Sequence, residues 1–249
     1  SRSGDGRAVF QSVAREFLGG IALRGLNIPS IGALAIVGTT TDNIDDGIFR
    51  DEYYNGKNKM VPPGILLRVG PSFLRIGNVQ IANERIGFDG VLRLVKYALK
   101  KINELETTNL VDYGKYGAGG KLSMEAMLQG ISPVDQSVCF FQKYPLNSNA
   151  DSSNCEIENT NTKNILQCFL NKFSSRLASL IASWNSNGFV HGVMNTDNIS
   201  LLGLTIDLNV FGFIGKYDLK WTPNHIDDEG RYRFGNQKDI GEWDLTRLI

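Results

Sequence analysis

The stretch from residue 191 to residue 207 constrains this chain more than any other part of its sequence. It reads His-Gly-Val-Met-Asn-Thr-Asp-Asn, continues through a short apolar run, and closes on a single carboxylate, Asp207. The side-chain oxygens of Asn198 and Asp207 are of the kind that hold Mg²⁺ beside nucleotide phosphates, where one or two protein ligands are completed by water. An Asn and an Asp at this separation are more often turn residues than ligands, so the pair alone decides nothing.

The residues around this pair follow the outline of a kinase-type catalytic loop. Such a loop opens with His-x-Asp, places a metal-binding Asn five residues after that Asp, and ends beyond a short hairpin at a metal-binding Asp. His191, Asn198 and Asp207 occupy these places, but the expected Asp is Val193. The loop therefore keeps its metal ligands and lacks the usual base, and Asp197 is the only nearby carboxylate that could replace it. We expect His191 to brace the loop.

The sequence of this stretch, with an Asp nine residues beyond the last Asn, resembles that of the selenoprotein O family. Further segments extend the resemblance along the chain: Arg-Val-x-Pro-Ser-x-Leu-Arg at residues 68–75, Asn-His-x-Asp at 224–227, and Gly-Arg-Tyr-x-Phe-x-Asn-Gln at 230–237. The resemblance implies a protein-kinase-like (pseudokinase) fold. It also implies an enzyme that transfers AMP, rather than phosphate, from ATP to Ser, Thr or Tyr hydroxyls of proteins.

The resemblance assigns roles to individual residues of the site. It implies that Asp197 takes the proton from the acceptor hydroxyl, and that Asn198 and Asp207 hold Mg²⁺, with Mn²⁺ as an alternative. Asp207 also counts among the nucleotide contacts. ATP would bind inverted, with its terminal phosphates held by Arg68 and Arg75. We expect these two arginines to lie away from the metal site.

Spacing and periodicity alone are weaker evidence for these roles than the family resemblance is. Two arginines beside a Gly-Pro turn can clamp a phosphate, but surface arginines are common. Glu16 lies at the edge of an apolar helical stripe and from periodicity alone is a surface residue. The resemblance instead makes it the helix C glutamate of a structural ion pair, and it places Asp5 and Gly6 near the nucleotide.

Composition limits the classes of partner. Lysine plus arginine and aspartate plus glutamate both number 26, which gives no reason to propose nucleic acid or an anionic membrane. Apolar runs are too short for a membrane span. The three cysteines, Cys139, Cys155 and Cys168, lack metal-ligand spacing and are expected to be ordinary thiols in a reducing compartment, mitochondrial or cytoplasmic. The oligomeric state stays open.

The order of periodic segments predicts an α+β fold. Helices are expected at residues 7–25, 88–102 and 165–184, and strands at 31–39 and 64–69, separated by a loop or irregular hairpin at 40–63. With the resemblance, residues 1–84 become a partial N-lobe with helix C. Residues 85–249 become a mainly helical C-lobe carrying an insert at about 107–163 and the catalytic loop at 191–207.

The chain reads as a central fragment of such a protein. The family's Gly-rich loop and ATP-contacting lysine would precede residue 1, so we expect Glu16 to have no partner within the chain and leave the activity of the fragment alone open. Asn209 and Val210 replace the Gly and Pro usual in the family. Two alternatives to AMP transfer remain at this point: a phosphate-transferring kinase, and a non-catalytic pseudokinase that binds nucleotide.

Overall fold

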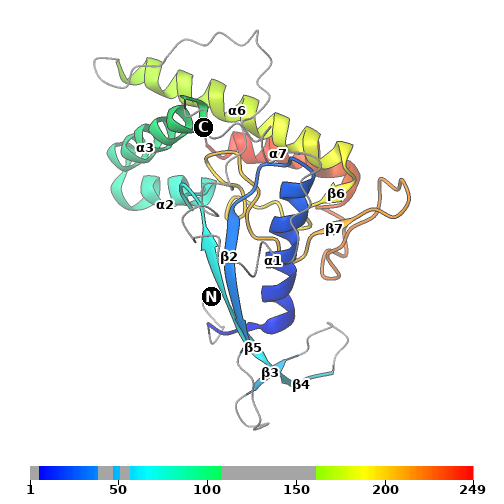
Figure 1. The fold of residues 1–249 in the computed structure, drawn as a ribbon. Coiled ribbons are helices and arrows are strands. Elements are labelled where there is room, and N and C mark those ends of the chain that lie inside the picture. The colour runs from blue at the N-terminus through cyan, green and yellow to red at the C-terminus, as the bar shows by residue number, and fades with distance from the viewer. Residues whose placement is uncertain (1–5, 39–46, 51–56, 108–160, 249) are drawn as a thin grey trace.

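The computed structural model describes residues 6–38, 47–50, 57–107 and 161–248, which form a mixed α+β structure (Figure 1). The helices are α1 (Phe10–Gly25), α2 (Ile76–Ile86), α3 (Phe88–Thr107), α6 (Thr162–Ser186) and α7 (Gln237–Thr246), with the 3₁₀ turn η3 (Phe234–Asn236) before the last. The strands are β1 (Ala8–Val9), β2 (Gly32–Gly38), β3 (Ile48–Arg50), β4 (Lys59–Val61), β5 (Pro63–Val69), β6 (Phe189–Val190) and β7 (Gly212–Phe213). The α+β class is confirmed. The division between residues 84 and 85, which falls within α2, stays a prediction.

A three-stranded antiparallel sheet in the order β1-β5-β2 lies against α1 (Figure 1). Its central strand β5 pairs with β2 in a register that places Ala35 opposite Leu67, with an irregularity between Ala33 and Ala35. Both predicted strands are confirmed. The first helix begins later than predicted, since Ala8–Val9 pairs with β5. Strands β3 and β4 form the hairpin expected between residues 40 and 63.

Helix α1 packs through a different face from the predicted one. We predicted a stripe of apolar residues four apart: Val9, Val13, Phe17 and Ile21. Val13 is buried, but Ile21 is 41% exposed, and the buried face includes Gly19 and Gly20. A Cβ added at Gly19 would come within 2.7 Å of the Phe211 ring. The missing side chain allows Phe211 to approach the helix closely, and this contact turns Ile21 toward solvent.

Helix α2 was not predicted. It buries Ile76, Gly77, Val79 and Ala82 and packs on α3. It is only 11 residues long and one of its buried positions is glycine, so no long apolar stripe marks it in the sequence. Helix α3 is confirmed and continues to Thr107, beyond the predicted end at residue 102.

Helix α6 forms the centre of the core, and its predicted apolar stripe is confirmed in full. All seven predicted residues are buried: Ile165, Phe169, Phe173, Leu177, Leu180, Ile181 and Trp184. They pack in one cluster with buried residues of α2, α3 and the segment 199–208. Arg176, which is also buried, donates a hydrogen bond to the Leu202 carbonyl at 2.9 Å. The segment that leads to Asp207 is thus fixed to the core.

The predicted insert at 107–163 lies almost entirely outside the described residues. Cys168 is disulfide-bonded, so the prediction of three ordinary thiols is wrong for this residue. The spacing of single cysteines does not reveal which thiols the fold brings together. Disulfides persist mainly in oxidising compartments, so the predicted reducing compartment loses that support. None of the helices in the described part of the chain combines the length and apolar character needed to cross a membrane.

Candidate active site

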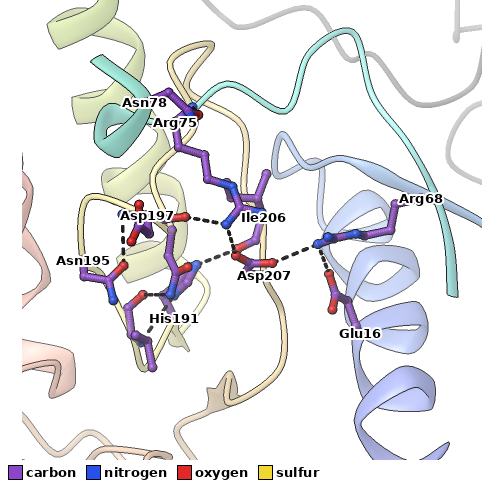
Figure 2. A network of polar contacts seen from close by, with 11 residues as sticks. Glu16, Arg68, Arg75, Asn78, His191, Asn195, Asp197, Ile206 and Asp207 are labelled. Atoms are coloured by element: carbon purple, nitrogen blue, oxygen red, sulfur yellow. Dashed lines mark hydrogen bonds and ion pairs between the residues drawn. The ribbon is translucent and has the colours of Figure 1, made fainter. Parts of the chain in front are cut away.

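The predicted catalytic loop begins at the end of β6 with a fully buried His191. Its ring Nε2 lies 2.8 Å from the Ile206 carbonyl, and its Nδ1 lies 3.4 Å from the Val193 amide (Figure 2). These contacts assign a neutral ring that donates from Nε2 and accepts at Nδ1. Burial lowers the pKa of His191, which favours the same neutral form. His191 therefore braces the loop against the residue preceding Asp207.

The middle of the loop is a tight turn held by its own side chains. The Asn195 side-chain oxygen accepts a hydrogen bond from the Asp197 amide at 3.1 Å, and the Asn195 carbonyl accepts one from the Asn198 amide at 2.8 Å. The Asn198 side-chain NH₂ donates to the Val193 carbonyl at 3.1 Å. This bond orients the Asn198 amide so that its oxygen is the atom free to meet a cation. The Asp197 side chain is exposed.

Asp207 is the centre of an ion-pair cluster (Figure 2). One carboxylate oxygen lies 2.9 Å from Nη1 of Arg68, and the other lies 2.8 Å from Nη1 of Arg75. The Asp207 backbone adopts a left-handed conformation with φ of 57°. Asp is one of the few residues with a side chain that adopt this region at modest cost, and such conformations concentrate at functional sites.

The prediction that Arg68 and Arg75 lie away from the metal site is wrong. Arg68 comes from β5 and Arg75 from the residue preceding α2, and each reaches a different carboxylate oxygen of Asp207. Arg75 Nη1 also donates to the Asp197 carbonyl at 2.6 Å. A single guanidinium thus links the candidate base and the candidate metal ligand, which are ten residues apart in the sequence.

The prediction that Glu16 has no partner within the chain is also wrong. Its carboxylate lies 2.7 Å from Nη1 of Arg68, which joins α1 to β5 and to Asp207. Burial raises the pKa of Glu16, against the opposing pull of Arg68 and with a further contribution from Asp207. Burial alone would lower the pKa of Arg68, but the two carboxylates outweigh it and raise that pKa. Two arginines and two carboxylates make the cluster formally neutral.

The structure does not bring the remaining predicted residues into this cluster. Asp5 lies outside the described residues. Gly6 is exposed, has a φ of 75°, and no described heavy atom lies within 4 Å of the position that a Cβ on it would take. The proximity of both residues to a nucleotide stays a prediction.

Three residues that anchor the site were missed by sequence reasoning. Gln237 is fully buried; its oxygen accepts from the His191 amide at 3.0 Å, and its NH₂ donates to the Phe189 carbonyl at 2.9 Å. Asn224 donates to the Gly192 carbonyl at 3.0 Å. Arg15 on α1 donates to the carbonyls of the segment after Asp207, those of Asn209 and Phe211. Asn224 and Gln237 belong to the segments that resemble the family. That resemblance was the only feature of the sequence that could have identified them as site residues.

The donor set suits Mg²⁺ in the presence of a nucleotide. Within the described ranges no group of three or more His, Cys, Asp or Glu side chains is placed to hold a metal ion. An amide oxygen from Asn198 and a carboxylate from Asp207 nonetheless fit the pattern in which Mg²⁺ is held by one or two protein oxygens together with phosphates and water. They supply no soft ligand such as a thiolate or imidazole.

Comparison with known proteins identifies the family of this chain. A family model described as "Protein adenylyltransferase SelO" matches residues 1–249. A "Protein nucleotidyltransferase YdiU" of Aromatoleum aromaticum is 36% identical over 250 residues, and one of Xanthomonas campestris pv. campestris is 34% identical over 249. Each match covers 100% of this chain and 37% of the relative, so the chain spans little more than a third of the length of these proteins. On the match to the whole chain, the protein belongs to the SelO family of protein adenylyltransferases.

Proposed function

We propose that this chain is the nucleotide-handling part of a protein adenylyltransferase, which transfers AMP from Mg-ATP to Ser, Thr or Tyr hydroxyls of other proteins. The observation that carries the proposal is the cluster in which Arg68 and Arg75 meet Asp207 while Arg75 holds the backbone of Asp197. Groups for binding phosphate, for holding a cation and for accepting a proton are therefore in one place.

Asp197 is the residue best placed to act as general base. Its backbone is fixed on both sides, by the Asn195 side chain at its amide and by Arg75 at its carbonyl. Its side chain is exposed, so an acceptor hydroxyl from another protein can approach it. A carboxylate held within hydrogen-bond reach of that hydroxyl would take its proton as the oxygen attacks the α-phosphorus.

Arg68 and Arg75 are suited to the terminal phosphates of an inverted ATP. Each arginine now binds one oxygen of the Asp207 carboxylate through its Nη1, and a guanidinium can bind phosphate oxygens in the same charge-assisted way, at one or two points. Their position beside Asp207 supports a pose in which the terminal phosphates of ATP and the cation lie next to each other. Bound Mg²⁺ would supply electrostatic stabilisation of the departing pyrophosphate, with Asn198 and Asp207 as its protein ligands.

We further propose that the fold is kinase-like. Helix α1 then corresponds to helix C of a partial N-lobe, and the helical part from α3 onward corresponds to the C-lobe. In kinases a helix C glutamate pairs with a strand lysine that contacts ATP phosphates. Here Glu16 pairs with Arg68 of β5, an ion pair between helix and sheet that supports a related arrangement.

The alternatives are a phosphate-transferring kinase and a non-catalytic pseudokinase. Full-length protein incubated with Mg²⁺ and ATP labelled at either the α- or the γ-phosphate separates all three, with its own chain and a generic acceptor protein as targets. We expect label on protein from α only. Label from γ would establish the kinase, and label from neither the pseudokinase.

Two variants identify the base in the same assay. Asp197→Asn should lower transfer of the α-label by roughly 10²- to 10⁴-fold, the usual contribution of a general base, while ATP binding persists. Asp228→Asn, which changes an exposed carboxylate outside the cluster, is the matched control and should leave transfer unchanged. Full activity of Asp197→Asn would overturn the assignment of the base.

A further inference from the structure

The start of helix α2 is built directly against the catalytic loop. The Gly77 amide donates to the Thr196 carbonyl at 2.9 Å, and the Ile76 amide donates to the Ile199 carbonyl at 3.1 Å. Arg75 pairs with Ser200 in an isolated antiparallel bridge. Residues 75–77 therefore bond to the loop both before and after Asp197 in the sequence, and these bonds fix the position of the loop.

Gly77 lies directly beside the Asp197 side chain. A Cβ placed on Gly77 would lie 2.1 Å from the Asp197 side-chain Oδ1 and 3.2 Å from its Cγ. The nearest backbone atom, the Thr196 carbonyl oxygen, would lie 3.6 Å away, an ordinary contact. A side chain at position 77 would thus clash with the carboxylate of Asp197 and leave the loop backbone in place.

We propose that Gly77 is a positioning residue for Asp197. Because glycine has no side chain, it leaves free the space that the Asp197 carboxylate occupies. The inference rests on the proposed function, in which Asp197 is the general base. Gly77 itself touches neither substrate nor the reacting atoms. It acts by permitting one orientation of the carboxylate, which Arg75 and Asn195 support from the backbone.

The position of Gly77 separates this role from a structural one. Gly77 is the second residue of α2, and Ala has a higher helix propensity than Gly. The Asp197 carboxylate is exposed and can rotate away from an added methyl group. Gly77→Ala should therefore keep or raise thermal stability while it moves the base, whereas a glycine needed only for packing would lose stability on the same change.

The test uses the full-length protein and measures kcat, KM for ATP and thermal midpoint. Gly77→Ala should lower kcat for AMP transfer by roughly 10- to 100-fold, the effect of displacing a catalytic group by about 1 Å. KM for ATP should stay within about twofold, because the atoms nearest to the added Cβ belong to Asp197 and Thr196 and not to the arginines or Asp207. Gly20→Ala is the matched control: it also changes a buried helical glycine, but its Cβ would meet only the Ile31 carbonyl oxygen, at 3.6 Å. It should leave kcat unchanged.

A double-mutant cycle with Asp197→Asn decides between the explanations. If Gly77 acts through Asp197, adding Gly77→Ala to Asp197→Asn should cause no further loss of the residual rate. An equal loss in both backgrounds would overturn the inference, as would a lowered thermal midpoint or an unchanged kcat for Gly77→Ala. If Asp197→Asn itself is fully active, the proposed base fails first, a result distinguishable from failure of the Gly77 role.

Discussion

Replacing Gln237 with Ala should loosen the catalytic loop at its start, where His191 follows β6. Gln237 begins α7 and is fully buried, and its amide meets both the His191 amide and the Phe189 carbonyl. A third bond, from its NH₂ to the Asn185 side chain at 2.8 Å, is only partly buried. The substitution removes all three bonds and no charge.

The magnitude follows from what the truncation leaves behind. His191 and Phe189 are both 0% exposed, so water cannot readily replace the lost partner of their backbone groups. A buried polar group left without a partner costs about 1–3 kcal/mol, which for two groups gives about 2–6 kcal/mol. Asn185 can turn to solvent and adds little. Since whole domains are stable by about 5–15 kcal/mol, the loss is a large fraction of the total.

The assay is urea unfolding of the full-length protein, read together with hydrogen exchange of the peptide that covers residues 189–193. Gln237→Ala should lower the unfolding midpoint and reduce protection of that peptide. Gln167→Ala is the control, since Gln167 is an exposed α6 residue whose amide bonds only to Asn171 in the described structure. It should change the free energy of unfolding by less than about 0.5 kcal/mol. A loss below about 1 kcal/mol for Gln237→Ala, with protection unchanged, would refute the reasoning.

Three further predictions concern the ion pairs and a buried acid. Asp207→Asn keeps the left-handed backbone but removes the charge, and should abolish AMP transfer and weaken Mn²⁺ binding in the presence of ATP, measured by electron paramagnetic resonance; wild-type Mn²⁺ affinity would contradict its role as a ligand. Arg68→Ala or Arg75→Ala should lower affinity for ATP by roughly one to two decades, because each charge-assisted contact is worth about 1.5–3 kcal/mol, and should affect AMP far less. Calorimetric titration checks this, and equal losses for both nucleotides would argue against the inverted pose. Burial raises the pKa of Asp244 from 3.8 to about 7, against the pull of Arg231, so the unfolded state loses this proton at lower pH than the folded state and stability falls as pH rises from about 4 to 7. Asp244→Asn should therefore gain thermal stability over the wild type, by up to about 4 kcal/mol at pH 8 and by little at pH 4; a gain independent of pH would refute this.

The parts of the fold that could be predicted are those in which periodicity and burial coincide. Helix α6 buries every residue of its apolar stripe because it packs on several neighbours at once. Helix α1 shows why the same reasoning fails elsewhere. It packs against Phe211 through a glycine, Gly19, and a residue without a side chain leaves no trace in an apolar pattern.

The candidate site also has parts that could be predicted from the sequence and parts that could not. The loop residues Asn198 and Asp207 could be found because the spacing of a catalytic loop is local in sequence. The pairing of Glu16 with Arg68 joins residues 52 apart, and that of Arg68 with Asp207 joins residues 139 apart. Such contacts depend on how the sheet is placed against the loop. No pattern within one segment contains that information, and our two errors about these side chains follow from its absence.

The backbone of Asp207 restricts how this site can be redesigned. With φ at 57°, the position accepts Gly, Asn and Asp at modest cost, while other residues carry a strain of about 1–3 kcal/mol. Asp is the only member of that set with a carboxylate. Replacing Asp207 with Glu is a usual first step in altering the reach and metal preference of a binding site. Here this change would strain the turn that His191 holds through the Ile206 carbonyl. A variant meant to change the cation preference of the proposed site is therefore better made at Asn198, whose φ is not positive.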